Sequence, residues 1–369
     1  KNYSVGIFYQ QKPSSIFIGI KVFINFILNL GYLQIKWIRN QSFQCREKIM
    51  VSIWKNFRLI YYKSCIDVIK PKAVVTFIDN SPYFGWLSRN CKDCPFIGIQ
   101  NGRRLSYIRN KDYNVQHLFS YGEQEKNYFS KIGYHVDNFY PAGSLVASLH
   151  FDPKLQLQKE IYDLLIVSCW RGNIGFNQDV KDSMKSMRIM DHLLAQYVKS
   201  RNIKAAVILR CERDSRDWIM PDIKEKFEID YFKNIYGDSL DIIETNFSNV
   251  AHKDYRNIFP LMQKSKVITS WLSSALLEAF GIGKKVLYCN FSGTNLYHSE
   301  VDKDLVTEKS NFPEFSKLMD SLIAHDPEDY KKINKEKMNY YMSFPSDLST
   351  YNFISNKIDE IIERSETLN

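Results

Sequence analysis

Residues 265–290 constrain the fold more than any other stretch, because they predict a strand, a helix and a second strand in immediate succession. The strand-like run 266–270 predicts the first strand, and the pair Ser273-Ser274 opens a short helix. A Gly-Ile-Gly sequence ends that helix before a second apolar run, 285–289. Two strands joined by a helix predict a parallel sheet with helices packed on its faces.

The start of this helix has the chemistry of a phosphate site. A helix N-terminus offers unpaired backbone N–H groups and a partial positive charge, and Ser273 and Ser274 add hydroxyls. Glu278 follows within the helix, where its carboxylate could reach a ribose hydroxyl. The alternative interpretation is a capped helix between two core strands, with no ligand.

The same alternation runs through the whole chain, which is long enough, at 369 residues, for two domains. Polar residues at 151–160 predict the linker between a first domain over 1–150 and a second over 161–325, before charged helices over 326–369. Strands are predicted at 3–9, 73–78, 96–99, 117–120, 162–168 and 204–209, and helices at 14–30, 45–69 and 178–201. This pattern predicts an α/β fold with two doubly wound parallel sheets.

Short motifs in both halves resemble known families. In the second half, Ser273-Ser274, Glu278-Ala279 and Gly-Ile-Gly-Lys-Lys-Val-Leu from 281 are similar to the nucleotide-sugar-binding unit of two-domain glycosyltransferases. In the first half, the segments 76–80, 96–103 and 119–123 are similar to bacterial surface-polysaccharide (O-antigen and capsule) biosynthesis proteins. Some transferases of that group use CMP-activated keto sugars such as Kdo or nonulosonic acids.

The resemblance implies the GT-B architecture, in which two Rossmann-like domains face each other across a cleft. It also implies that the helical tail packs back toward the first domain. The donor would be a nucleotide-sugar bound by the second domain, and the acceptor a glycan or lipid-linked glycan.

Two carboxylates of the first half are candidate catalytic residues, because ligands of open α/β sheets bind beyond the carboxyl ends of the strands. Asp79 directly follows one predicted strand and Glu123 another, and either could remove a proton from an acceptor hydroxyl. Asp79 could instead be a nucleophile. The structural alternatives are an Asx turn or helix cap for Asp79 and a helix-dipole contact for Glu123.

Neutral and basic side chains at the same strand ends are candidate sugar-binding groups. Asn80, Gln100 and Asn101 supply hydrogen bonds for hydroxyls, and Gly102 permits a tight turn. Arg103 suits a carboxylate or phosphate, which favours an acidic sugar. An ordinary polar turn is the alternative.

In the second half, Arg171 and Arg210 follow two predicted strands and complete the predicted nucleotide site with Ser273, Ser274 and Glu278. Arg171 is the first candidate for a phosphate contact, and Arg210 resembles the basic residue that this class of enzyme places near the nucleotide. Surface ion pairing is the alternative for both arginines.

The formal charge of +9 indicates an anionic partner, such as a nucleotide-sugar, an acidic glycan or an anionic membrane surface. Nucleic acid is not expected, because basic residues do not form a compact run with interleaved aromatics. The sole Asp-x-Asp, at 302–304, follows polar residues and predicts a solvated turn rather than a metal site. We therefore expect a metal-independent enzyme with no cofactor besides its donor substrate.

Seven scattered cysteines favour a reducing, cytoplasmic compartment. Cys91 and Cys94 have the spacing of half a zinc site, but a second pair is missing, and thiols of a surface loop are the preferred interpretation. The apolar stretch 16–38 is interrupted by Lys21, Asn25 and Asn29, so a buried amphipathic helix is preferred over peripheral contact with the inner face of the cytoplasmic membrane.

The sequence thus predicts a metal-independent GT-B glycosyltransferase of surface-polysaccharide assembly. Two alternatives stay open. One is a nucleotide-sugar epimerase or hydrolase on the same fold, and the other is a non-catalytic subunit that binds nucleotide-sugar.

Overall fold

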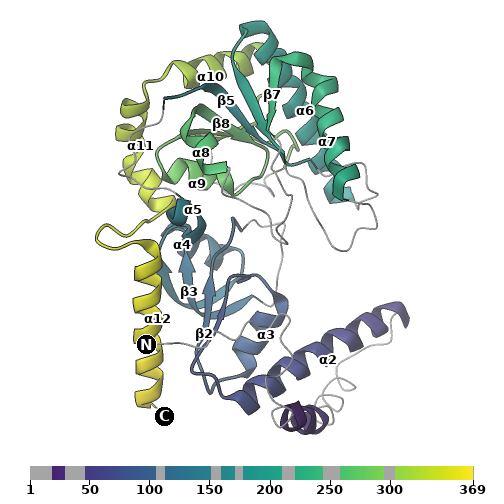
Figure 1. The fold of residues 1–369 in the computed structure, drawn as a ribbon, viewed down its shortest axis with the longest axis vertical. Coiled ribbons are helices and arrows are strands. Elements are labelled where there is room, and N and C mark those ends of the chain that lie inside the picture. Colours follow the sequence, from purple (N-terminus) through teal and green to yellow (C-terminus); the bar gives the residue numbers. More distant parts are fainter. Residues whose placement is uncertain are drawn as a thin grey trace.

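The computed structural model contains two parallel sheets in two α/β domains, one above the other in Figure 1, and the predicted fold class is confirmed. The structure describes residues 19–29, 46–104, 113–150, 159–170, 178–209, 221–243, 258–294 and 304–368. The predicted strand at 3–9 lies outside these ranges, as does most of the predicted linker.

The sheet of the first domain has four described strands in the order β1-β2-β3-β4, all pairing in parallel. Its elements are β1 (Val74–Thr76), α3 (Pro82–Asn90), β2 (Phe96–Ile99), β3 (Asn114–Ser120), α4 (Gln124–Lys131), β4 (His135–Pro141) and α5 (Leu145–His150). Phe96, Val115 and Leu118 are fully buried in the core that α3 and α4 cover. Short apolar runs buried on both faces are typical of parallel strands.

The second sheet has six described strands in the order β10-β9-β8-β5-β6-β7, again parallel. The strands are β5 (Tyr162–Val167), β6 (Ala205–Ile208), β7 (Leu240–Ile243), β8 (Ser265–Ser270), β9 (Lys285–Cys289) and β10 (Val306–Thr307). Counted from β5, this is the order 3-2-1-4-5-6 of dinucleotide-binding folds. The direction of winding reverses between β5 and β8.

Helices cover both faces of the second sheet. They are α6 (Gln178–Arg201), α7 (Pro221–Tyr236), the short 3-10 helix η1 (Gly237–Ser239), α8 (Ile258–Gln263), α9 (Ala275–Gly281) and α10 (Phe312–Ala324). Met190 and Leu194 of α6 share one core with Phe315 of α10, whereas Phe259 of α8 and Phe280 of α9 belong to the core on the other face. The sheet is therefore doubly wound.

Two tail helices, α11 (Pro327–Tyr341) and α12 (Thr350–Leu368), connect the domains. Figure 1 shows α11 beside the second domain and α12 running down along the first. Ile354 and Ile361 of α12 pack on Ile97 and Phe119 of the first sheet. The Thr350 hydroxyl also donates to the Ala142 carbonyl at 3.0 Å.

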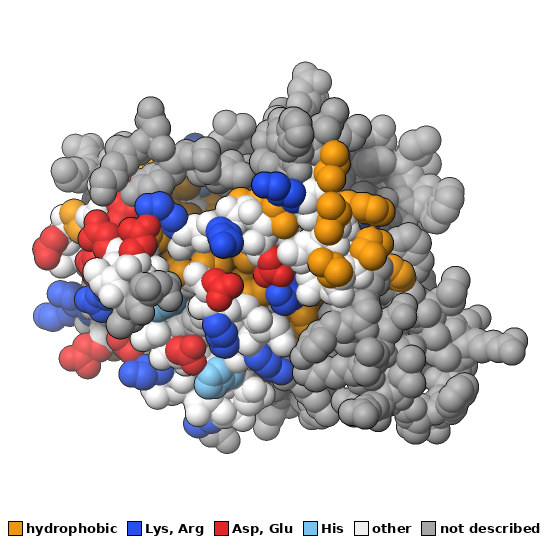
Figure 2. Space-filling view, turned by 90° about the horizontal axis from the view of Figure 1, so that it is seen from below, with side chains coloured by type: hydrophobic (Ala, Val, Ile, Leu, Met, Phe, Trp, Pro, Cys, Tyr) orange, Lys and Arg blue, Asp and Glu red, His pale blue; other side chains and the backbone are white. Residues whose placement is uncertain are grey.

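The lower end of the molecule consists of α2 (Arg46–Ile69) and a helix over 19–29. The two helices contact each other through the rings of Phe26 and Phe57, 6.0 Å apart, and through Asn29 Nδ2, 3.3 Å from Ser64 Oγ. Figure 2 shows hydrophobic side chains gathered on this lower face. Among the helices described, none has the length and apolar content needed to cross a membrane.

Helix 19–29 corrects one prediction. The sequence predicted a buried amphipathic helix, but only one edge of this helix is covered, with Val22 3% exposed, while Phe23 and Leu28 are 63% and 72% exposed. Asn29, one of the residues that interrupt the apolar stretch, contacts Ser64 of α2. Most of its apolar residues therefore lie on the outside.

Candidate active site at the domain interface

The switch point of the second sheet lies between β5 and β8. The two strands end in Val167 and Ser270, and the Ser270 hydroxyl donates to the Val167 carbonyl at 2.7 Å. Cys169 Sγ, just beyond β5, lies 3.2 Å from Ser270 Oγ. Because the chain leaves these strands toward opposite faces of the sheet, a crevice for ligands forms here in open α/β folds.

Ser274 lies on the segment that leaves β8, and it contacts the first domain. Its hydroxyl accepts a hydrogen bond from the Arg103 backbone N–H at 2.8 Å. A Cβ atom added to Gly102 would lie 3.1 Å from Ser274 Oγ, so glycine allows this close approach. The predicted sugar-binding loop and the predicted phosphate-binding hydroxyl are thus brought together.

Ser273 supports the same turn. Its hydroxyl accepts a hydrogen bond from the Ala275 N–H at 3.3 Å, and its carbonyl accepts one from the Tyr288 hydroxyl at 3.0 Å. The following helix, α9, has seven residues, so its dipole is small and the hydroxyls matter more.

Glu278 of α9 is the second point of contact between the domains. The Ser144 hydroxyl, which also accepts the Ala147 N–H at 3.1 Å, donates to Glu278 Oε1 at 2.5 Å. Burial raises the pKa of Glu278 to about 7, although the hydrogen bond from Ser144 acts to lower it. The buried Tyr121 lies close enough for Glu278 to raise its pKa, after burial, further above the ordinary value.

Asp79 lies just past β1, as predicted, but its carboxylate is 1% exposed and bound on several sides. It forms an ion pair with Arg104, whose Nε lies 3.3 Å from Oδ2, and accepts the Tyr113 hydroxyl at 2.8 Å and the Asn101 N–H at 3.4 Å. Arg104 Nη1 in turn donates to the Gly102 carbonyl at 2.9 Å. Asp79 therefore holds the loop that contacts Ser274, and its catalytic role stays a prediction.

Gln100 joins the ends of β2 and β3. Its Oε1 accepts the Tyr121 N–H at 2.8 Å, and its Nε2 donates to the Gly102 carbonyl at 3.1 Å and to Glu125 Oε1 at 3.0 Å. Burial raises the pKa of Glu125 to about 7, while the hydrogen bonds from Gln100 and Gly122 act to lower it. Glu125 was not predicted from the sequence, although its position in the first turn of α4 was an available signal.

The remaining loop residues lie at the edge of this network. Asn101 Oδ1 accepts a hydrogen bond from Arg104 Nη2 at 2.9 Å, and Asn80 is half-buried. Arg103 is 8% exposed, and its guanidinium lies over the Tyr288 ring of the second domain, 4.6 Å from the centroid. Arg103 thus contacts the second domain through both backbone and side chain.

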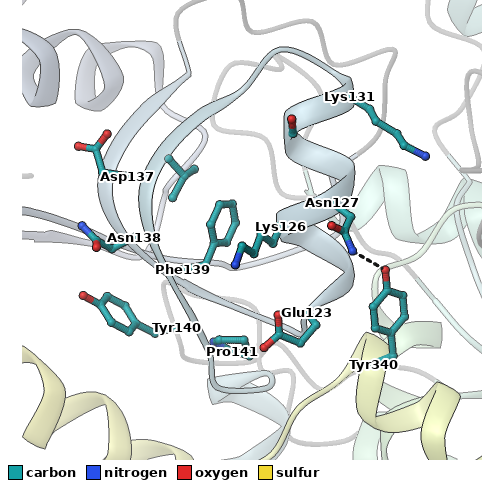
Figure 3. Close-up of a pocket in the computed structure, with 12 residues that line it drawn as sticks. Glu123, Lys126, Asn127, Lys131, Asp137, Asn138, Phe139, Tyr140, Pro141 and Tyr340 are labelled. Atoms are coloured by element: carbon teal, nitrogen blue, oxygen red, sulfur yellow. Dashed lines mark hydrogen bonds between the residues drawn. The ribbon is translucent and has the colours of Figure 1, made fainter.

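Glu123 is placed differently from Asp79, because it is exposed and lines a groove of about 940 Å³ between α4 and β4. Figure 3 shows Glu123 and Lys126 on the α4 side, Asn138 and Tyr140 on β4, and Tyr340 of α11 beside Asn127. The Asn127 side chain donates to the Tyr340 hydroxyl at 3.0 Å. Aromatic rings beside amides and charges make this groove able to hold a polar ligand.

The remaining predicted residues lie either outside the described ranges or away from the domain interface. Arg171 and Arg210 lie outside the described residues and stay predictions. Cys91 and Cys94 are in the core of the first domain, not in an exposed loop, and burial raises the pKa of each thiol to about 11. Within the described ranges, His, Cys, Asp and Glu side chains form no group of three suited to a metal ion.

Of the comparisons with known proteins, only the one with solved structures found similar proteins, and it supports the fold alone. No protein-family model matches the chain, and no curated protein matches it. Among solved structures, S. aureus MnaA in complex with UDP is similar, with a TM-score of 0.51 and 15% identity over 88% of this chain and 82% of that one. A candidate UDP-N-acetylglucosamine 2-epimerase from Listeria monocytogenes has a TM-score of 0.50 and 15% identity over 80% and 75% of the two chains.

Proposed function

We propose that this chain is an enzyme that uses a nucleotide-sugar, with the nucleotide bound at the switch point between β5 and β8. The observation that carries the proposal is the 3-2-1-4-5-6 strand order, whose switch point faces the loop of the first domain at Ser274. The hydroxyls of Ser273 and Ser274 would receive the phosphate, together with Arg171 and Arg210. Glu278 would accept a ribose hydroxyl.

Each of these groups would exchange a contact on binding. The Ser274 hydroxyl accepts the Arg103 N–H, and a phosphate oxygen could take over that N–H while the hydroxyl turns to donate to the same phosphate. Glu278 would lose the hydrogen bond from the Ser144 hydroxyl and accept one from a ribose hydroxyl instead. Binding would therefore shift the domains by a small amount, and each hydrogen bond lost between them would be replaced by one to the ligand.

The reaction we propose is transfer of the sugar to a growing surface polysaccharide or lipid-linked glycan. Asn80, Gln100, Asn101, Gly102 and Arg103 would hold the sugar, and Arg103 favours an acidic keto sugar delivered from a CMP donor. Glu123, exposed in the groove beside α4, is better placed than Asp79 to take a proton from an acceptor. Such an enzyme would work in the cytoplasm, at the inner face of the membrane.

A nucleotide-sugar 2-epimerase is the second candidate, favoured by the similarity of fold to the candidate UDP-N-acetylglucosamine 2-epimerase from Listeria monocytogenes. An epimerase changes its sugar without an acceptor, whereas a transferase needs one. Incubating the protein with CMP-, UDP-, GDP- and dTDP-sugars, with and without a lipid-linked glycan, separates the two. Sugar inversion in the absence of acceptor would establish the epimerase.

Binding is tested by replacing both Ser273 and Ser274 with alanine. Each hydrogen bond to a charged phosphate contributes about 1.5–3 kcal/mol, so calorimetry should show a Kd raised by at least about tenfold. Ser346→Ala, a change at an exposed serine of the tail, is the matched control. If the double variant binds every nucleotide-sugar as tightly as the control does, the proposed site is wrong.

A further inference from the structure

Helix 19–29 has an apolar stripe on its outer face. Ile20, Phe23, Ile24, Ile27 and Leu28 are 52%, 63%, 54%, 49% and 72% exposed, in that order. Their spacing of three and four residues places them on one side of the helix. Figure 2 shows hydrophobic side chains grouped on the lower face, where this helix lies. Contiguous apolar patches of this kind mark surfaces that bind something.

The opposite side of the helix is held by the protein. Val22 is 3% exposed, Phe26 packs against Phe57 of α2, and Asn29 donates to Ser64, which is fully buried. The apolar stripe is therefore fixed in direction by a packed and hydrogen-bonded edge.

The positive charge of the chain is concentrated in the part of the sequence that contains this helix. Residues 1–58 contain a single acidic residue, Glu47, and nine basic ones, so they carry +8 of the total +9. The remaining 311 residues are almost neutral, with 41 basic and 40 acidic side chains. The basic residues are Lys1, Lys12, Lys21, Lys36, Arg39, Arg46, Lys48, Lys55 and Arg58.

We infer that helix 19–29 docks the protein on an anionic phospholipid surface, lying in the plane of the interface with its apolar stripe in the lipid. An amphipathic helix rich in flanking Lys and Arg binds membranes in this way, through buried apolar area and attraction to anionic headgroups. The charge decides between occupants, because a second copy of this basic segment would be repelled, whereas an anionic bilayer attracts it. Binding of this kind does not require a helix that spans the membrane.

Docking at this end has a consequence for the reaction. The helix belongs to the domain that we propose presents the acceptor, and Figure 1 places it at the end farthest from the second domain. A lipid-linked acceptor would thus be met by the first domain, while the second stays in the aqueous phase to exchange soluble nucleotide-sugar. Docking itself is independent of the proposed donor site, and it would hold for an epimerase too.

The test is co-sedimentation of the full chain with vesicles of phosphatidylcholine, with and without phosphatidylglycerol. Wild-type protein should bind the anionic vesicles and largely dissociate at about 0.5 M salt, where the Debye length falls to a few ångströms. Replacing Phe23 and Leu28 with glutamine should lower the partition coefficient by roughly tenfold or more. Both side chains are exposed, so circular dichroism should show an unchanged fold.

The matched control replaces Phe227 and Ile333, which are 54% and 72% exposed on α7 and α11, with glutamine. This pair should bind vesicles as the wild type does. Equal loss in both variants, or equal binding of wild type to neutral and anionic vesicles, would overturn the inference. A wild-type dimer that becomes a monomer in the stripe variant, without vesicle binding, would instead make the stripe an interface between copies. Turnover of a soluble nucleotide-sugar, measured without vesicles, tests the proposed function separately.

Discussion

Polar side chains at the carboxyl ends of the strands bind partners within the same domain in the first sheet, but partners across the domain interface in the second. In the first domain, Asp79 binds Arg104 and Tyr113, and Gln100 binds Glu125, all within the same domain. These contacts do not involve the second domain. They form a scaffold that fixes the loop between β2 and β3.

In the second domain, Ser274 and Glu278 find their partners across the interface, in Arg103 and Ser144. Such contacts last only while the domains stay together. A ligand that enters between the domains would compete with this second set and leave the first intact. The comparison thus separates residues that shape the site from residues that would bind in it.

The largest effect is expected from Arg104→Ala, which leaves the buried Asp79 carboxylate without its ion-pair partner. Breaking a buried pair in this way costs about 3–5 kcal/mol of folding stability. Lys63→Ala is the control, since it removes a partly exposed pair with Asp67 in the same domain, worth about 0.3–0.5 kcal/mol. Urea denaturation read by hydrogen exchange of the β2 and β3 amides measures both. Equal losses in the two variants would contradict the scaffold role.

A smaller effect is expected from pH acting on Glu278. Its folded pKa is raised from 4.5 to about 7, so between these values the folded protein holds a proton that unfolding releases. The stability contribution of Glu278 is therefore highest below pH 4.5 and falls as pH rises to about 7, by on the order of 3 kcal/mol. Glu278→Gln should flatten this part of the stability profile. Parallel profiles for variant and wild type would show that Glu278 is not buried at the interface.

Much of the fold could be predicted, because each buried parallel strand is a short apolar run bounded by turn residues. The strands of the unit over 265–290 were predicted for this reason and are confirmed, as is the predicted helix over 178–201. The strand β4, at the edge of the described part of the sheet, was not predicted, because exposed His135, Asp137 and Asn138 interrupt its half-buried residues. Its pattern lacks a continuous apolar run.

The site was harder to predict, for two physical reasons. Arg103 and Ser274 are 171 positions apart, and a contact between domains has no local signature in the chain. Glu123 and Glu125 are two positions apart, yet one is exposed and the other 2% exposed, because the start of α4 decides which one faces the sheet.

A smaller loss of stability is expected from Ser144→Ala, which tests the contact between the two domains at Glu278. It removes the donor to Glu278 and the cap of the Ala147 N–H, which together should cost about 1–2 kcal/mol. Because the Ser144 hydrogen bond acts to lower the pKa of Glu278, its loss should move the pH midpoint upward. Ser81→Ala, at the N-terminus of α3, is the control. An unchanged midpoint in Ser144→Ala would mean that the contact between domains does not influence Glu278.

The smallest effect is expected from EDTA, which should leave turnover unchanged. A transferase must stabilise negative charge on the leaving phosphate, and either a metal ion or fixed donors can do so. The sole Asp-x-Asp of the sequence, at 302–304, follows polar residues instead of a strand, whereas the switch point offers two hydroxyls and, on our proposal, Arg171 and Arg210. Turnover measured with the best donor, before and after chelation, decides the matter. Activity lost in EDTA and restored by Mg²⁺ or Mn²⁺ would mean that the second domain supplies carboxylates for a metal. The second sheet would then bind the phosphate through a metal ion as well as through hydroxyls.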